Sequence, residues 1–159
     1  MIRVMIIAVG GMKERDLSES CSEYMKRLGA FCSPEILELK EAKLPEAPSA
    51  KEIAAALSEE GARILAALPR KTFSVVLTPE GNQLSSEETA AAIERASICH
   101  PSISFVAGSS YGLDPAVKKR ADLLLSFSRM TFPHRLFRVM LLEQIYRSFT
   151  IIRGTGYHK

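Results

Sequence analysis

Short apolar runs alternate along the chain with longer stretches in which apolar residues recur every three or four positions. The short runs are bounded by turn-forming residues, as strands usually are. They predict strands over residues 2–9, 35–40, 72–78, 103–107 and 121–126. The longer stretches predict helices over residues 14–28, 49–68, 85–97 and 133–149, with a short helix beginning near residue 114. Such alternation is typical of α/β proteins, and one α/β domain accounts for residues 1–159.

Residues that favour helix ends support several of these boundaries. Asp114 followed by Pro115 supplies an N-cap and a favoured first helical residue. Gly29 is expected to end the first long helix, at the position where glycine commonly does so. Capping-box patterns open two other helices, at Ser49 with Glu52 and at Ser85 with Glu88.

The last predicted helix carries more apolar residues than the single stripe of a surface helix. Burial on more than one side is therefore expected, against its own sheet and against a partner subunit, which predicts a symmetric homodimer. A monomer with a central C-terminal helix is the alternative. The apolar residues are Leu136, Phe137, Val139, Met140, Leu141, Leu142, Ile145, Tyr146 and Phe149.

Basic charge is concentrated in the last quarter of the chain. Residues 1–117 carry 12 Lys and Arg against 16 Asp and Glu, whereas residues 118–159 carry 9 against 2. The two balances are −4 and +7. Such asymmetry is the expected footprint of a surface that meets a polyanion, most commonly nucleic acid. A solvated basic face is the alternative.

Several classes of protein are disfavoured. No apolar run is long enough to span a bilayer and no signal peptide is recognisable, so we expect no membrane association and a cytoplasmic location. The three cysteines and three histidines show no ligand spacing, so no metal is expected, and the cysteines are expected to be reduced. GxSxG, HExxH, GxGxxG and P-loop motifs are absent.

Three glycine-bearing turns follow predicted strands: residues 10–11, 79–81 and 108–112. Glycine lets main chain approach a ligand closely, and open parallel sheets bind ligands beyond the carboxyl ends of their strands. The turns therefore permit a ligand crevice, although ordinary turns are an equal interpretation.

Longer motifs occupy the C-terminal segment. Residues 125–149 read LSFSRMTFPHRLFRVMLLEQIYRSF, and the chain ends RGTGYHK. Together with LTPEG at residues 77–81 and FVAG at residues 105–108, they resemble the RlmH family of SPOUT methyltransferases over the whole chain. One departure is Ser109, where the family commonly has a second glycine after Gly108. We expect this change to leave cofactor binding intact.

The resemblance implies an α/β fold with a Rossmann-like parallel sheet, flanking helices and a C-terminal trefoil knot. It implies a homodimer that uses S-adenosyl-L-methionine (SAM) to methylate N3 of a pseudouridine in 23S ribosomal RNA of the assembled ribosome. The SAM pocket would lie at the knot, and the dimer interface would complete the active site. By motif, the pocket residues would be Leu77, Gly108, Phe127, Ser128, Arg129, Met130, Thr131 and Phe132.

Substrate contacts are expected from the C-terminal segment. Arg147, Tyr157 and His158 are the candidate catalytic residues, with His158 a candidate proton acceptor, since the N3 proton must leave during transfer and a cation would favour the resulting anion. A frayed terminus is the alternative for the C-terminal tail, residues 151–159. A non-catalytic ribosome-binding protein and a SPOUT enzyme acting on tRNA remain open. Candidate RNA-binding residues are Arg135, Arg138, Arg153 and Lys159.

Overall fold

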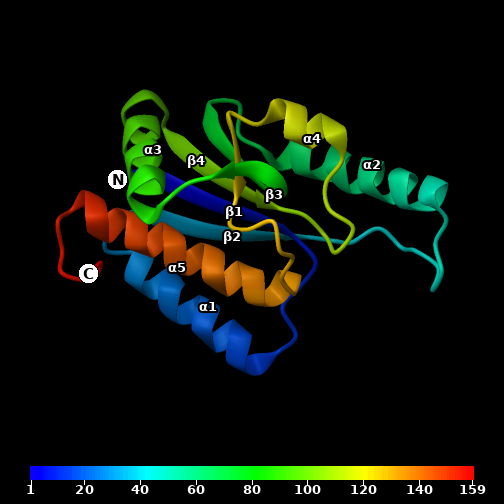
Figure 1. The fold of residues 1–159 in the computed structure, drawn as a ribbon, viewed down its shortest axis with the longest axis horizontal. Helices are drawn as coiled ribbons and strands as arrows, with labels where there is room; N and C mark the ends of the chain where they lie inside the picture. The colour runs from blue at the N-terminus through cyan, green and yellow to red at the C-terminus, as the bar shows by residue number, and fades with distance from the viewer.

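The computed structural model describes residues 1–159, which form a five-stranded sheet with helices on both faces (Figure 1). Every strand pair is parallel, and the strands lie in the order β2-β1-β4-β3-β5. The predicted α/β class and parallel sheet are thus confirmed. The strands are β1 (Arg3–Val9), β2 (Ser33–Leu39), β3 (Thr72–Gln83), β4 (Ser102–Ala107) and β5 (Leu123–Ser126).

The helices form two layers. On one face, α5 (His134–Ile152) packs beside both α1 (Arg15–Leu28) and α3 (Ser86–Cys99). On the other face, α2 (Ala50–Ala67) packs beside α4 (Pro115–Arg120). Each layer closes its own apolar core against the sheet, so the sheet is covered on both sides.

The central strand β1 supplies side chains to both cores. Val4 and Ile6 lie in the core under α1, α3 and α5, whereas Met5, Ile7 and Val9 lie in the core under α2 and α4. A strand covered on both faces has no solvated side, which explains why β1 is apolar at nearly every position.

Most predicted helix ends are confirmed. The side chains of Ser49 and Ser85 accept the main-chain N–H three residues later in complete capping boxes, and Asp114 caps α4. Gly29 behaves differently: its φ of −57° is right-handed. The carbonyl of Leu28 accepts N–H groups from the next turn instead, so α1 ends without a left-handed glycine.

Strand β3 is longer than predicted, and the expected turn at residues 79–81 lies within it. Leu77 and Asn82 both pair with Leu125 of β5, so residues 78–81 leave the ladder and rejoin it at the same partner. A Cβ on Gly81 would lie 2.8 Å from the main-chain carbon of Leu124. Glycine therefore permits this segment to press directly against β5.

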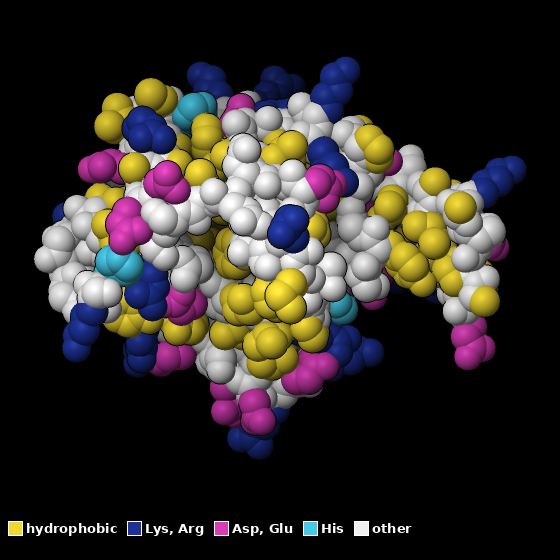
Figure 2. Space-filling view, viewed as in Figure 1, with side chains coloured by type: hydrophobic (Ala, Val, Ile, Leu, Met, Phe, Trp, Pro, Cys, Tyr) yellow, Lys and Arg dark blue, Asp and Glu magenta, His cyan; other side chains and the backbone are white.

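The two faces of α5 have different surroundings. Leu141, Leu142 and Ile145 are buried in the core, whereas Leu136 is 41% exposed on the outer face. Met130, in the preceding loop, is 74% exposed. Figure 2 shows apolar side chains gathered on the surface over the first half of α5. The helix ends at Ile152 rather than at the predicted residue 149.

Three further observations bear on the classes of protein considered above. No helix combines the length and the apolar character needed to cross a bilayer. No group of three or more His, Cys, Asp or Glu side chains is arranged to hold a metal ion. All three cysteines are free thiols, two of them buried.

Candidate active site

A cleft of about 350 Å³ opens at the carboxyl ends of β3, β4 and β5. This is the edge at which open α/β sheets bind ligands, and the volume lies within the roughly 300–1,000 Å³ usual for small-molecule sites. The walls come from the end of β3, the loop after β4, and the segment joining β5 to α5. The lining residues are Leu77, Thr78, Pro79, Ala107, Gly108, Ser109, Ser110, Gly112, Leu113, Leu125, Phe127, Ser128, Met130, Thr131, Phe132, Pro133, His134 and Phe137.

The loop after β4 contributes mainly main chain and small side chains. Gly112 has a φ of +96°, in the left-handed region that favours glycine, and its N–H donates to the carbonyl of Ser109 at 2.9 Å. A Cβ on Gly108 would lie 2.3 Å from the carbonyl oxygen of Gly112. Glycine is therefore required at Gly108, and the resulting tight turn exposes its backbone to the cleft.

The loop between β5 and α5 is shaped by local hydrogen bonds. The Ser126 hydroxyl lies 2.9 Å from the Pro79 carbonyl oxygen and 3.0 Å from that of Ser128. The N–H of Met130 donates to the Ser128 hydroxyl at 3.0 Å. This loop is therefore tied both to itself and to the bulged part of β3.

Aromatic rings give the same loop an apolar surface. The ring of Phe127 lies 4.8 Å from that of Phe137 in α5, and Phe132 stacks on Phe137 at 6.4 Å, centroid to centroid. Among all the lining residues, only His134 has a titratable side chain. The cleft therefore offers apolar contact and main-chain hydrogen bonding rather than fixed charge.

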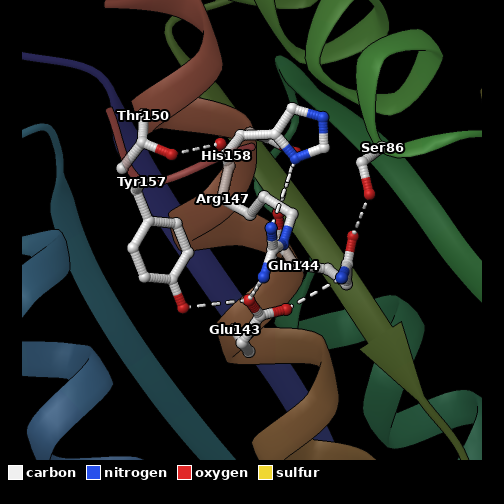
Figure 3. Close-up of polar contacts among 8 residues, drawn as sticks. Ser86, Glu143, Gln144, Arg147, Thr150, Tyr157 and His158 are labelled. Atoms are coloured by element: carbon white, nitrogen blue, oxygen red, sulfur yellow. Dashed lines mark hydrogen bonds and ion pairs between the residues drawn. The ribbon is translucent and has the colours of Figure 1, made fainter. Parts of the chain in front are cut away.

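A second cluster, at the other end of α5, is polar and includes the C-terminal tail (Figure 3). Arg147 pairs with Glu143 at 2.6 Å, and the hydroxyl of Tyr157 donates to the same carboxylate at 3.1 Å. Arg147 Nη1 lies 3.2 Å from His158 Nδ1, and His158 Nε2 lies 2.8 Å from a carboxylate oxygen of Glu87 in α3. This network joins the tail to two helices.

The electrostatics of the cluster favour a neutral phenol beside charged neighbours. Burial is the main cause that raises the pKa of Tyr157 to about 12. Hydrogen bonding to Glu143 raises the pKa of Arg147, whose guanidinium also lies 4.9 Å from the centre of the Tyr157 ring. Hydrogen bonds lower the pKa of the Glu87 carboxyl to about 2. The largest effect comes from the main-chain N–H of Glu87 itself, and the next largest comes from His158.

The cleft and the polar cluster lie at different ends of α5. The helix lines the cleft as far as Phe137, and Arg147 lies ten residues later, which corresponds to roughly 15 Å at 1.5 Å per residue. None of the side chains of Arg147, Tyr157 and His158 lines the cleft in this structure.

Comparison with known proteins shows the family. A family model described as "Predicted SPOUT methyltransferase" matches residues 2–158. Proteins named "Ribosomal RNA large subunit methyltransferase H" from Streptococcus thermophilus and Clostridium beijerinckii are 45% identical to the chain over 159 residues, covering 99% of this chain and 100% of each relative. The chain belongs to the RlmH family of SPOUT methyltransferases. The resemblance seen in the sequence is therefore confirmed.

A solved structure supports the architecture. "The structure of a probable methylase family protein from Haemophilus influenzae Rd KW20" matches with a TM-score of 0.54 at 12% identity, covering 99% of this chain and 70% of that chain. At this identity the likeness shows the fold alone.

The structure brings together nearly all the cofactor residues expected from the RlmH resemblance. Arg129 is the exception, because its side chain is exposed and does not line the cleft. The lining fits SAM: adenine needs an apolar slot with a few main-chain hydrogen-bonding groups, and the glycine turn leaves backbone open to a ligand. The seven residues that line the cleft as predicted are Leu77, Gly108, Phe127, Ser128, Met130, Thr131 and Phe132.

The expected RNA-binding residues are placed unevenly. Arg153 and Lys159 are exposed near the C-terminus, and Arg135 is partly exposed and pairs with Glu14. Arg138 is only 3% exposed. It therefore offers no surface to RNA, and the expectation of an RNA contact there is wrong.

The buried guanidinium of Arg138 has a structural role instead. It donates to the Gly10 carbonyl at 2.8 Å and pairs with Glu38 of β2. These contacts fasten the first half of α5, and with it the cleft wall, to the carboxyl ends of β1 and β2.

Sequence reasoning missed two residues that support the cleft from behind. Glu60 and Gly61 of α2 are buried, and both contact the segment after β4. Glycine inside a helix is unfavourable relative to alanine, so Gly61 was a visible signal of close packing. Nothing in the sequence distinguished Glu60 from the exposed acids around it.

Proposed function

We propose that the chain transfers a methyl group from SAM to N3 of a pseudouridine in 23S ribosomal RNA, in the assembled ribosome and in the cytoplasm. The observation that carries this proposal is the cleft at the sheet edge, assembled from the same segments that carry the RlmH motifs. Identity of 45% with ribosomal RNA large subunit methyltransferases over the full length supports the substrate class.

The cleft residues hold the cofactor by shape and backbone. Leu77, Phe127 and Phe132 supply the apolar slot for adenine, and Gly108 and Gly112 bring main chain close to the polar part of SAM. When bound, SAM supplies a methyl carbon already activated by its sulfonium. The protein must therefore chiefly align the nucleophilic nitrogen and exclude water.

The trefoil knot is also part of the proposal. Leu125 pairs with residues on both sides of the bulge at 78–81, so β5 emerges beside a segment that folds around it. The chain then crosses from β5 at one edge of the sheet to α5, which packs against α1 and α3. Passage of the C-terminal segment through the bulge accounts for the pairing of Leu125 on both sides of the bulge and for the crossing from β5 to α5.

A symmetric homodimer would unite the cleft with the tail. The surface near the cleft is apolar at Leu136, on the outer face of α5, and at Met130, in the loop before it. Two α5 helices crossing in opposite directions about a two-fold axis would set the tail of each subunit beside the cleft of the other. This arrangement bridges the separation of roughly 15 Å between Phe137 and Arg147 along one helix.

In that dimer the carboxyl-terminal end of α5 and the tail would supply the charge that the cleft lacks. The Arg147 guanidinium favours the anion that forms as the pseudouridine N3 proton leaves. His158, whose Nε2 contacts Glu87 in the free protein, is the proposed acceptor of that proton. Arg153 and Lys159 contact phosphates, consistent with the basic C-terminal quarter.

Two measurements test the function. Calorimetry with S-adenosylhomocysteine should show one site per protomer, and mass spectrometry of RNA from cells lacking the gene should show loss of a methylated pseudouridine from 23S ribosomal RNA. Binding without that loss, but with a methyl group missing from tRNA, would indicate a tRNA enzyme. No binding and no lost modification would indicate a ribosome-binding protein without catalysis.

A further inference from the structure

The buried carboxylate of Glu60 lies directly behind the cleft. Its side chain is on α2, only 5% of the residue is exposed, and it bonds to two different loops. One oxygen accepts the hydroxyl of Ser109 at 2.9 Å, and the other accepts the main-chain N–H of Ala42 at 3.0 Å. A buried carboxylate is costly unless its oxygens are satisfied, and here both donors are uncharged groups, Ser109 in the cleft loop and Ala42 in the loop after β2.

Gly61, the next residue of α2, packs closely against the start of α4. A Cβ on Gly61 would lie 2.7 Å from the Cβ of Asp114 and 3.4 Å from Cγ2 of Val117. Asp114 in turn caps α4 by accepting the N–H of Ala116 at 2.7 Å. Two successive residues of α2 thus support both the cleft loop and the start of α4, which follows it.

Ser109 connects the contacts made by Glu60 and Gly61 to the cleft. It lines the cleft together with Ser110 and Gly112, and its carbonyl accepts the Gly112 N–H that closes the tight turn. A change in the Ser109 position would therefore move the main chain of Gly108 and Gly112, and Gly108 has little room to adjust because it packs against the Gly112 carbonyl and Leu113.

We propose that Glu60 is a positioning residue that fixes the cleft loop, through Ser109, in the shape that receives SAM. The proposal rests on the function proposed above and extends it to a residue outside the cleft. The Ser109 hydroxyl is the group through which the buried carboxylate of α2 restrains the cleft loop.

The first test is Glu60→Gln, with Glu59→Gln as the matched control. Glutamine has the same size and can still bond to both loops, with its oxygen accepting the Ala42 N–H and its NH2 donating to the Ser109 hydroxyl, but it carries no charge. Both bonds therefore become weaker bonds between neutral groups. Glu59 is adjacent on α2 and pairs only with Arg63 at the surface. We expect Glu60→Gln to weaken S-adenosylhomocysteine binding about tenfold, because the bond between Ser109 and residue 60 loses its charged partner. The control should bind as the wild type does.

Two readouts separate positioning from general damage. Amide hydrogen exchange at residues 109–113 should quicken in ligand-free Glu60→Gln, while exchange in β1 stays unchanged. The KM for SAM should rise about tenfold with kcat at saturating SAM nearly unchanged, as expected when binding is weakened but transition-state stabilisation is not.

A double-mutant cycle provides a second route, and its Ser109→Ala variant tests the proposal by itself if Glu60→Gln folds poorly. Ser109→Ala alone should weaken binding about fivefold, and Glu60→Gln added to it should weaken binding much less than it does in the wild type, because coupled residues are not additive. Full additivity, or unchanged Kd in Ser109→Ala, would overturn the positioning role. Wild-type protein that ignores S-adenosylhomocysteine would instead overturn the proposed function.

Discussion

The amino-terminal end of α5 borders a cleft in which His134 is the only titratable lining residue, whereas its carboxyl-terminal end carries the network of Glu143, Arg147, Tyr157 and His158. The first region is shaped by glycine turns, aromatic rings and main-chain hydrogen bonds. The second is held by ion pairs that are partly open to solvent. The same helix therefore borders a preformed neutral site and a charged surface cluster.

The difference indicates what each region can bind. A neutral cleft with fixed walls suits a small molecule recognised by shape. The Arg147–Glu143 pair is internal to α5, whereas the pair that holds the tail, between His158 and Glu87, has a carboxylate that is 62% exposed. Exposed pairs contribute little to stability, so we expect the tail to be able to exchange this contact for contacts with RNA phosphates. The cleft is expected to be complete in the free protein, and the tail to find its partners on another subunit and on RNA.

The largest expected effect is that of Arg147→Ala. Loss of a group that stabilises developing negative charge typically lowers kcat by about 100-fold to 1,000-fold. The Kd for S-adenosylhomocysteine should not change, since Arg147 does not line the cleft. Single-turnover methylation of ribosomes and calorimetry measure the two quantities. Equal losses in both would show that the regions are not separate.

Gly108→Ala should damage the cleft and leave the tail intact. The added Cβ would lie 2.3 Å from the Gly112 carbonyl oxygen, and overpacking of this kind costs about 2 kcal/mol, or about 30-fold in Kd for S-adenosylhomocysteine. Gly156→Ala is the control, because no atom lies within 4 Å of its added Cβ. Ribosome binding by Gly108→Ala should persist in a sedimentation assay, and its disappearance would contradict this separation.

Mixing these two variants tests whether the regions meet across a dimer. Subunits carrying Arg147→Ala and Gly108→Ala should form mixed dimers with one intact cleft beside one intact tail. Activity should rise about tenfold above either variant alone, if each active site is shared between subunits. Activity no greater than the average of the two variants would show that each subunit acts alone.

Changes in the tail should have a smaller effect, which appears in the salt dependence of ribosome binding. Arg153→Ala or Lys159→Ala should weaken ribosome binding about threefold to tenfold and reduce the slope of log K against log salt by about 1 for each phosphate that the variant no longer neutralises. SAM binding should be unaffected. Both residues are exposed, so neither change should alter stability. An unchanged slope would show that the substituted residue does not bind RNA.

Local chemistry made much of this molecule predictable from its sequence. Apolar runs located the strands, capping boxes located the starts of α2 and α3, and the motif segments identified most of the cleft lining. The burial of Arg138 was also open to inference, because it shares the inward helical face of Leu141, Leu142 and Ile145. The concentration of basic residues in that segment directed attention to its charge alone.

Other features depend on contacts between distant parts of the chain. Pairing of Leu77 and Asn82 with the same Leu125 is set by the path of β5, which no local pattern specifies. The bond from Ser109 to Glu60 spans 49 positions in the sequence. A tertiary structure was needed for both.

The smallest expected effect concerns pH and the tail. Burial raises the pKa of Tyr157 from 10.0 to about 12, so folding favours its protonated form. This contribution to stability is fully present below pH 10 and is lost as the pH rises toward about 12. Phenolate absorbance of the wild type minus that of Tyr157→Phe should therefore titrate near pH 12, while the cleft still binds S-adenosylhomocysteine at pH 9. A difference titration near pH 10 would mean that the tail does not pack against Glu143 and Tyr146, as its hydrogen bond of 3.1 Å and ring distance of 4.9 Å require.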